Sequence, residues 1–165
     1  MPVNNQKGFT LIELLIVIAV IGVLAGILVS VLDVQEYQRQ ARDARRMNDI
    51  LSVQTALIDS MATSNITLVD TFGCTDCTSL TGTNSIYGDG WVKFTDLKGR
   101  GLIDLISTVP TDTQNNETYH FSYYSDGVDF ELNAVFESKK YQVNAQQDGG
   151  NDDTVYERGF NLHLK

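Results

Sequence analysis

The stretch FTLIELLIVIAVIGVLAGILVSVL, residues 9–32, contains one ionisable side chain, Glu13, in 24 positions. As a helix it would be about 36 Å long at roughly 1.5 Å per residue, and the hydrocarbon core of a bilayer is about 30 Å thick. The rest of the chain is too small to bury a helix that is apolar on every side. We therefore predict that residues 9–32 form a transmembrane helix.

A secretory signal peptide is the main alternative for an apolar segment close to an N-terminus. Its apolar region has about 7–15 residues and ends at a cleavage site of small residues. The run here is longer, and it ends in Leu32-Asp33-Val34-Gln35. We expect the segment to remain in the mature protein as a single span. Because Lys7 precedes it and most of the chain follows it, we expect the N-terminus in the cytoplasm and the remainder outside the cytoplasmic membrane.

Glu13 is the unusual residue of this segment. A carboxylate inside a lipid-exposed helix costs roughly 2.5–3.5 kcal/mol on insertion scales unless it is neutralised or paired. Glu13 stands about one turn from the start of the helix, so its side chain can also reach the membrane interface. Its position alone leaves both a functional and a merely interfacial role open.

The residues around Glu13 carry a resemblance to a known family. Lys7-Gly8-Phe9-Thr10-Leu11-Ile12-Glu13 resembles the leader junction of type IV pilins and of type II secretion pseudopilins. The resemblance implies that a prepilin peptidase cleaves between Gly8 and Phe9 and methylates the new amine of Phe9. It also implies that Glu13 pairs with the Phe9 amine of a neighbouring subunit during assembly. Such a charge-assisted pair is strong in a dry filament core.

The same resemblance implies a function. The chain would be a structural subunit, not an enzyme, stored in the membrane as a prepilin and polymerised through its N-terminal helix. Its partners would be copies of itself, other pilin-like subunits, the prepilin peptidase, the inner-membrane assembly platform and the lipid bilayer. The product would be a cell-surface pilus or a periplasmic pseudopilus. Alternatives are a filament-tip binding module and a membrane-anchored thiol-redox domain.

Three regions follow from this interpretation: a leader at residues 1–8, the assembly half of a helix at residues 9–32, and an extracytoplasmic head at residues 33–165. Residues 33–62 lack Pro and Gly, so we expect the helix to continue without interruption to about residue 62. Its second half is amphipathic. The residues expected to face a sheet are Met47, Ile50, Leu51, Leu57, Ile58 and Met61.

A basic cluster lies in the same helix at Arg39, Arg42, Arg45 and Arg46. Acidic residues are interleaved with it, and Arg39 with Asp43 and Arg45 with Asp49 have the i, i+4 spacing of helical ion pairs. We interpret the cluster as a solvated helix face. The net charge of −9 argues against nucleic acid as a partner, because such binding depends on Lys and Arg neutralising phosphates.

The remainder of the head divides into a connecting region, residues 63–117, and a sheet, residues 118–165. Trp91–Ile106 is expected to hold a short helix. Alternating apolar residues predict strands at Thr118–Tyr124 and Val128–Glu137, joined by a turn at Ser125-Asp126-Gly127. Further strands are expected at Lys140–Ala145 and at residues 155–164, where Gly159 interrupts the pattern. The predicted fold is α+β, a long N-terminal helix packed on a C-terminal antiparallel sheet, which is the pilin architecture by resemblance.

Cys74 and Cys77 form a C-x-x-C pattern with several interpretations. A local disulfide suits an extracytoplasmic domain. A thioredoxin-like site requires a helix that starts at the second cysteine. A zinc site requires four ligands, for which only His120 and His163 remain. Two free thiols are the fourth possibility.

The segment Asp148-Gly149-Gly150-Asn151-Asp152-Asp153 is a Gly-rich acidic turn. Calcium takes six to eight oxygen ligands from flexible loops of this composition. By resemblance to pseudopilins, which hold calcium in an acidic loop before the last strand, Asp148, Asp152 and Asp153 are candidate calcium ligands. The alternative is a solvated turn, since Asn, Asp and Gly are ordinary turn residues.

Overall fold

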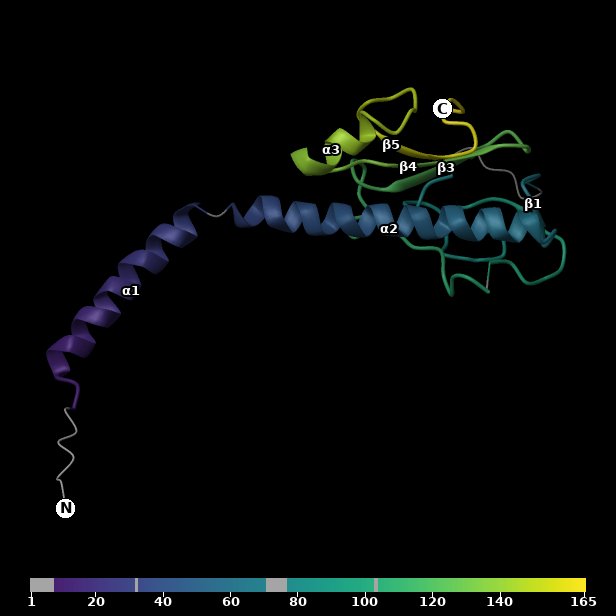
Figure 1. Cartoon of the computed structure of the whole chain (residues 1–165). Helices are drawn as coiled ribbons and strands as arrows, with labels where there is room; N and C mark the ends of the chain where they lie inside the picture. The colour runs from purple at the N-terminus through teal and green to yellow at the C-terminus, as the bar shows by residue number, and fades with distance from the viewer. Residues whose placement is uncertain (1–7, 32, 71–76, 103) are drawn as a thin grey trace, which may run out of the picture. The chain divides into compact units, whose positions relative to one another are not determined.

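The computed structural model describes residues 8–31, 33–70, 77–102 and 104–165 (Figure 1). The chain divides into two compact units between Tyr37 and Gln38. The first unit contains helix α1, and the second contains most of helix α2 together with all of the sheet structure.

Helix α1 spans Leu11–Val31 and agrees with the predicted span. Its Leu, Ile and Val side chains between Leu11 and Leu28 are exposed to the surroundings. Within the described residues it is the one helix that is long and apolar enough to cross a membrane. Its composition therefore suits a hydrocarbon environment.

Helix α2 spans Val34–Ala62, so the single uninterrupted helix expected over residues 9–62 is wrong. Asp33 provides the reason for a new helix start. Its carboxylate accepts a hydrogen bond from the amide of Glu36 at 3.0 Å, which is the geometry of an N-cap. Asp33 followed three residues later by Glu36 is also the capping-box pattern. Leu32 lies outside the described residues.

The buried face of α2 differs in part from the predicted one. Ile50 and Leu57 are buried as expected, whereas Leu51 and Ile58 are each 36% exposed. The missed core residues are Val53 and Ala56. Residues 50, 53 and 57 share one side of a helix with 3.6 residues per turn, and residues 51 and 58 lie about 100° away from it.

The first turns of this face are charged rather than apolar. Arg46 is 1% exposed and Asp43 is fully buried, so the prediction of a solvated basic face is wrong for Arg46. Arg42 is half-buried and binds Glu137 through two hydrogen bonds of 2.8 and 2.6 Å. Arg45 does lie on the surface and pairs with Asp49 at 3.7 Å, as predicted.

The connecting region contains a two-stranded ribbon instead of the short helix expected in Trp91–Ile106. Strand β1, Ile66–Thr67, pairs antiparallel with strand β2, Thr95–Asp96. The Asp96 carboxylate then accepts hydrogen bonds from three amides, those of Lys98, Arg100 and Gly101. This side chain organises a turn where a helix was expected. Ile103 lies outside the described residues.

The main sheet contains strands β3, Phe121–Ser125, β4, Phe130–Ala134, and β5, Tyr156–Gly159, in the order β3-β4-β5. All pairs are antiparallel, and the predicted β3–β4 hairpin is confirmed. Gly127 in its turn has a φ of 92°, which an L side chain rarely adopts. The core cluster takes in Phe121, Tyr123, Phe130 and Leu132 of the sheet and the apolar face of α2, which runs alongside the sheet in Figure 1.

The strand expected at Lys140–Ala145 is instead helix α3, Lys139–Ala145. Tyr141 packs on Phe136 with ring centroids 5.6 Å apart, and Ala145 is buried. These two contacts are four residues apart, which is a helical spacing. The last predicted strand is β5, and it ends at Gly159, where an added Cβ would lie 1.9 Å from the carbonyl oxygen of Phe130.

Candidate functional site

The described residues that precede α1 are accessible. Gly8, Phe9 and Thr10 are exposed and precede the first helical residue, Leu11. A Cβ added to Gly8 would meet no atom of the described chain within 4 Å. The bond between Gly8 and Phe9 therefore lies in an open, non-helical segment.

Thr10 and Glu13 form a reciprocal cap at this helix start. The amide and the hydroxyl of Thr10 both donate to Oε2 of Glu13, at 2.8 and 2.9 Å. The amide of Glu13 donates back to the Thr10 hydroxyl at 3.3 Å. The carboxylate of Glu13 is thereby held against the chain next to Phe9. The [ST]-x-x-[DE] pattern ahead of an apolar run would have predicted this role for Thr10.

The Glu13 carboxylate therefore has hydrogen-bond donors within its own chain. Both bonds end on Oε2, so Oε1 is not used by Thr10. A carboxylate has about four acceptor positions, and a second donor can therefore bind without displacing Thr10. The geometry suits a site that takes up one further cationic or N–H donor.

An exposed Gly-Phe-Thr segment precedes a capped helix that is long and apolar enough to cross a membrane, and comparisons with known proteins identify the family. The family described as "Prokaryotic N-terminal methylation motif" matches residues 3–29. The "Fimbrial protein" of Pseudomonas aeruginosa is 35% identical over 113 residues, which are 63% of this chain and 68% of that protein. The "Type IV major alpha-pilin" of Moraxella bovis is 44% identical over 54 residues, 33% of each chain. The chain belongs to the type IV pilin family of fimbrial proteins.

A further relative is also a fimbrial protein. The "Fimbrial protein EcpB" of Eikenella corrodens is 43% identical over 66 residues, 40% of each chain. No solved structure matches the chain. The protein is thus a type IV pilin-like pilus subunit with α1 as its membrane anchor.

The C-x-x-C pattern is described only at its second cysteine, since Cys74 lies outside the described residues. The carbonyl of Cys77 accepts a hydrogen bond from the amide of Tyr123 at 2.8 Å. Thr78 then forms a β-bridge with Ser122. The chain after Cys77 is therefore attached to the sheet edge, and it does not begin the helix that a thioredoxin-like site requires. The Cys74–Cys77 disulfide stays a prediction.

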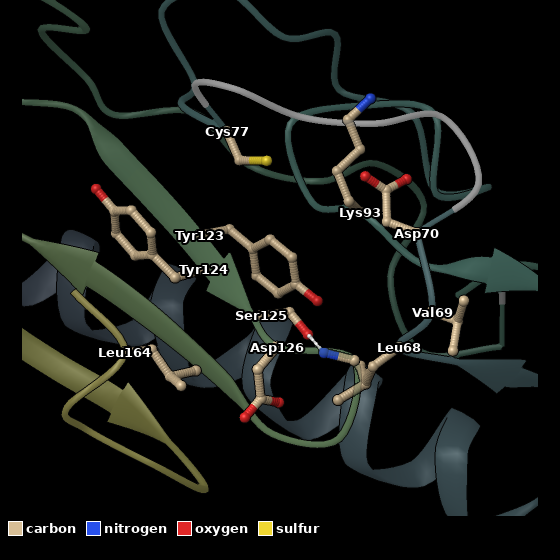
Figure 2. Close-up of a pocket in the computed structure, with 11 residues that line it drawn as sticks. Leu68, Val69, Asp70, Cys77, Lys93, Tyr123, Tyr124, Ser125, Asp126 and Leu164 are labelled. Carbon is tan, nitrogen blue, oxygen red and sulfur yellow. Dashed lines mark hydrogen bonds between the residues drawn. The ribbon is translucent and has the colours of Figure 1, made fainter.

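A pocket of about 550 Å³ lies beside Cys77 (Figure 2). Figure 2 shows the ring of Tyr123 among the side chains that line it. The Tyr123 hydroxyl is buried, and burial raises the pKa of Tyr123. The nearby Ser125 hydroxyl donates to the carbonyl of Asp129 and accepts from the amide of Gly127. Asp70 and Cys77 flank residues 71–76, which lie outside the described part of the chain, so we assign the pocket no ligand.

Two carboxylates of the acidic turn accept hydrogen bonds from the turn and from the residues that follow it. Asp148 accepts hydrogen bonds from the amides of Gly150 and Glu157, at 2.9 and 2.8 Å. Asp152 accepts from the amide and the hydroxyl of Thr154, at 2.9 and 2.6 Å. Asp153 is exposed. In the part of the chain that the structure describes, no group of three or more His, Cys, Asp or Glu side chains is gathered for a metal ion. The calcium ligands therefore stay a prediction.

The region beneath this turn contains acidic residues that the sequence patterns did not indicate. Glu157 is 1% exposed, and burial raises its pKa. The charges of Glu131, Asp148 and Asp152 raise that pKa further. The Oδ1 atom of Asn133 is buried without a hydrogen-bond partner among the described residues. Asn133, Asp152 and Glu157 line one small pocket together with Lys165.

Proposed function

We propose that the chain is a prepilin, stored in the cytoplasmic membrane and cleaved between Gly8 and Phe9. The new Phe9 amine is methylated, and the subunit then polymerises through α1. The observation that carries the proposal is the capped helix start. It places an accessible Gly8–Phe9 bond directly beside the Glu13 carboxylate. The head lies outside the cytoplasm, and the protein has no catalytic role of its own.

The open surroundings of Gly8 support cleavage by a separate enzyme. A peptidase must hold a substrate segment in an extended form, and a segment already outside the helix needs no unwinding. Because a Cβ at Gly8 meets no described atom of this chain, a requirement for glycine would come from the peptidase and not from the fold of the substrate.

The Oε1 atom of Glu13 supports the assembly step. While the subunit is alone, Thr10 satisfies the carboxylate through Oε2. In the filament, the methylated Phe9 amine of a neighbouring copy would bind the same carboxylate. A charge-assisted hydrogen bond in a site without water is stronger than the bonds from the neutral donors of Thr10. The exchange favours the assembled state over the stored one.

The test is intact mass measurement and N-terminal sequencing of the protein from membranes of cells with an active prepilin peptidase. The proposal predicts a chain that begins at N-methyl-Phe9. A chain that still begins at Met1 would overturn it. The relatives named fimbrial proteins favour a surface pilus over a periplasmic pseudopilus. Immuno-electron microscopy with an antibody to the head would distinguish the two: label on surface filaments supports the pilus, and label confined to the periplasm opposes it.

We propose also that the turn at Asp148, Asp152 and Asp153 binds calcium. The buried Oδ1 of Asn133 and the buried Glu157 support a cation near this turn. Calorimetric titration of the full chain in detergent would show heat and a rise in melting temperature. No heat and no thermal shift would exclude calcium.

We propose, third, that Cys74 and Cys77 form a disulfide. Mass measurement after alkylation, with and without reduction, tests it: two alkyl groups added without reduction would contradict the disulfide. Replacement of both cysteines by Ser, with normal filaments as the outcome, would exclude the thiol-redox alternative.

A further inference from the structure

Along the sequence of α2, the buried charged residues come first and the buried apolar residues follow. The first buried residues of α2 are Asp43 and Arg46, and the buried apolar residues begin at Ile50. Met47 is only partly buried. Two types of contact therefore follow one another along a single helix.

Asp43 binds the chain between β4 and α3. It accepts hydrogen bonds from the amide of Glu137 at 3.0 Å and from the amide of Ser138 at 2.7 Å. The Ser138 hydroxyl also donates to it at 2.6 Å. This hydroxyl stands at the N-cap of α3 but makes no capping bond there. The side chain that would ordinarily cap α3 instead holds α2.

Arg46 joins three carboxylates. It donates to Asp43 at 2.7 Å, to Glu137, and to both oxygens of Asp112. Its guanidinium also lies 4.9 Å from the centre of the Tyr119 ring. Arg42 binds Glu137 from the adjacent turn of the helix. We call Arg42, Asp43, Arg46, Asp112 and Glu137 the charge cluster.

The charge cluster and the apolar core have different partners. The cluster binds Asp112, Glu137 and Ser138, none of which lies in a strand of the main sheet. The core side chains of α2 from Ile50 onward share a cluster with the strand residues Phe121, Phe130 and Leu132. Loss of one ion partner leaves the others buried without compensation, whereas the apolar contacts are unaffected by charge. Units with separate contacts of this kind open separately.

From these contacts we propose that residues 38–49 of α2 form a latch. The charge cluster closes it, and when the cluster is broken this stretch detaches from the head while Ile50–Leu57 stay docked. In a subunit whose α1 is fixed in a membrane or a filament, the latch sets how many residues of α2 can move between that anchor and the head. The latch does not depend on cleavage at Gly8, because all of its contacts lie within the head unit.

Hydrogen exchange measured by mass spectrometry on the full chain in detergent micelles tests the latch. The variant is Glu137→Gln, which removes one charge shared by Arg42 and Arg46. The amides of residues 42–49 should exchange at least about tenfold faster than in the wild type, and in both proteins they should exchange faster than those of residues 53–60, whose opening requires the whole head to unfold. The control Asp104→Asn breaks the exposed Arg100–Asp104 pair and should change neither segment.

Equal protection of both segments would show one cooperative unit and overturn the latch, and so would unchanged exchange of residues 42–49 in the variant. The wild type gives a second measurement, independent of any substitution. At urea concentrations below the unfolding transition, residues 42–49 should exchange through an opening that leaves residues 53–60 protected. A single common opening for both segments would again overturn the proposal.

Discussion

Replacing Glu137 by Gln removes an ionised group that lies between two guanidinium groups. The hydrogen bond from Arg42 lowers the pKa of Glu137 from 4.5 to about 2, with Arg46 adding to the effect and burial opposing it. A difference of about 2.5 pKa units corresponds to roughly 3–4 kcal/mol at about 1.4 kcal/mol per unit. A carboxylate whose pKa falls on folding stabilises the folded state above its unfolded pKa. That stabilisation is lost as the pH falls through the folded pKa.

The free energy of unfolding of the wild type should therefore exceed that of the variant by roughly 3–4 kcal/mol at pH 7. The difference should decline below about pH 4.5 and approach zero near pH 2. Urea unfolding of both proteins in the same detergent, followed by circular dichroism between pH 7 and pH 2.5, measures it. Asp104→Asn serves as control, since an exposed pair contributes about 0–1 kcal/mol. A deficit that is the same at pH 7 and pH 2.5 would refute the reasoning, because it could not then arise from the ionised carboxylate.

The remaining predictions concern the N-terminus and one strand. Gly8→Ala should leave membrane insertion unchanged and reduce leader removal, as read from the mass of the membrane-bound protein; normal trimming would contradict the cleavage site. Glu13→Val should insert normally into the membrane and give few filaments in a shearing assay. Glu13→Gln retains an oxygen acceptor for Thr10 but has no charge, and it should give equally few filaments. Normal filaments from Glu13→Gln would show that the charge is not needed. Gly159→Ala should lower the free energy of unfolding by about 1–3 kcal/mol, because its Cβ would displace the Phe130 carbonyl. An unchanged urea midpoint would show that the strands separate without cost.

The elements predicted correctly are those with a strong local pattern. The apolar run predicted α1 because a segment of that length and uniformity suits a membrane span and little else. Apolar and polar residues alternate in Phe121–Ser125 and in Phe130–Ala134, and Gly127 lies between them. This pattern likewise predicts a hairpin and few other structures. The segment Lys139–Ala145 is seven residues long, and in so short a stretch the helical and strand periods are hard to separate.

The charge cluster could not be predicted from neighbouring residues. Arg46 lies on a helix with other charges, which ordinarily indicates a solvated face. Its partners Asp112 and Glu137 are 66 and 91 residues further along the chain. Only the folded arrangement brings them together. The cap between Thr10 and Glu13, by contrast, is local, and the capping pattern alone contains it.

The hydrogen bond between Asp148 and Glu157 has a consequence for the exposed edge of the main sheet. Strand β5 is the last in the order β3-β4-β5, so one of its edges faces away from the sheet. On that edge the Glu157 amide is occupied by the Asp148 carboxylate. An unpaired edge amide is a template for aggregation between identical chains, and an acidic side chain placed over it prevents such pairing. The acidic turn therefore removes one free amide from the outer edge of β5 and makes that edge less able to pair with a second sheet.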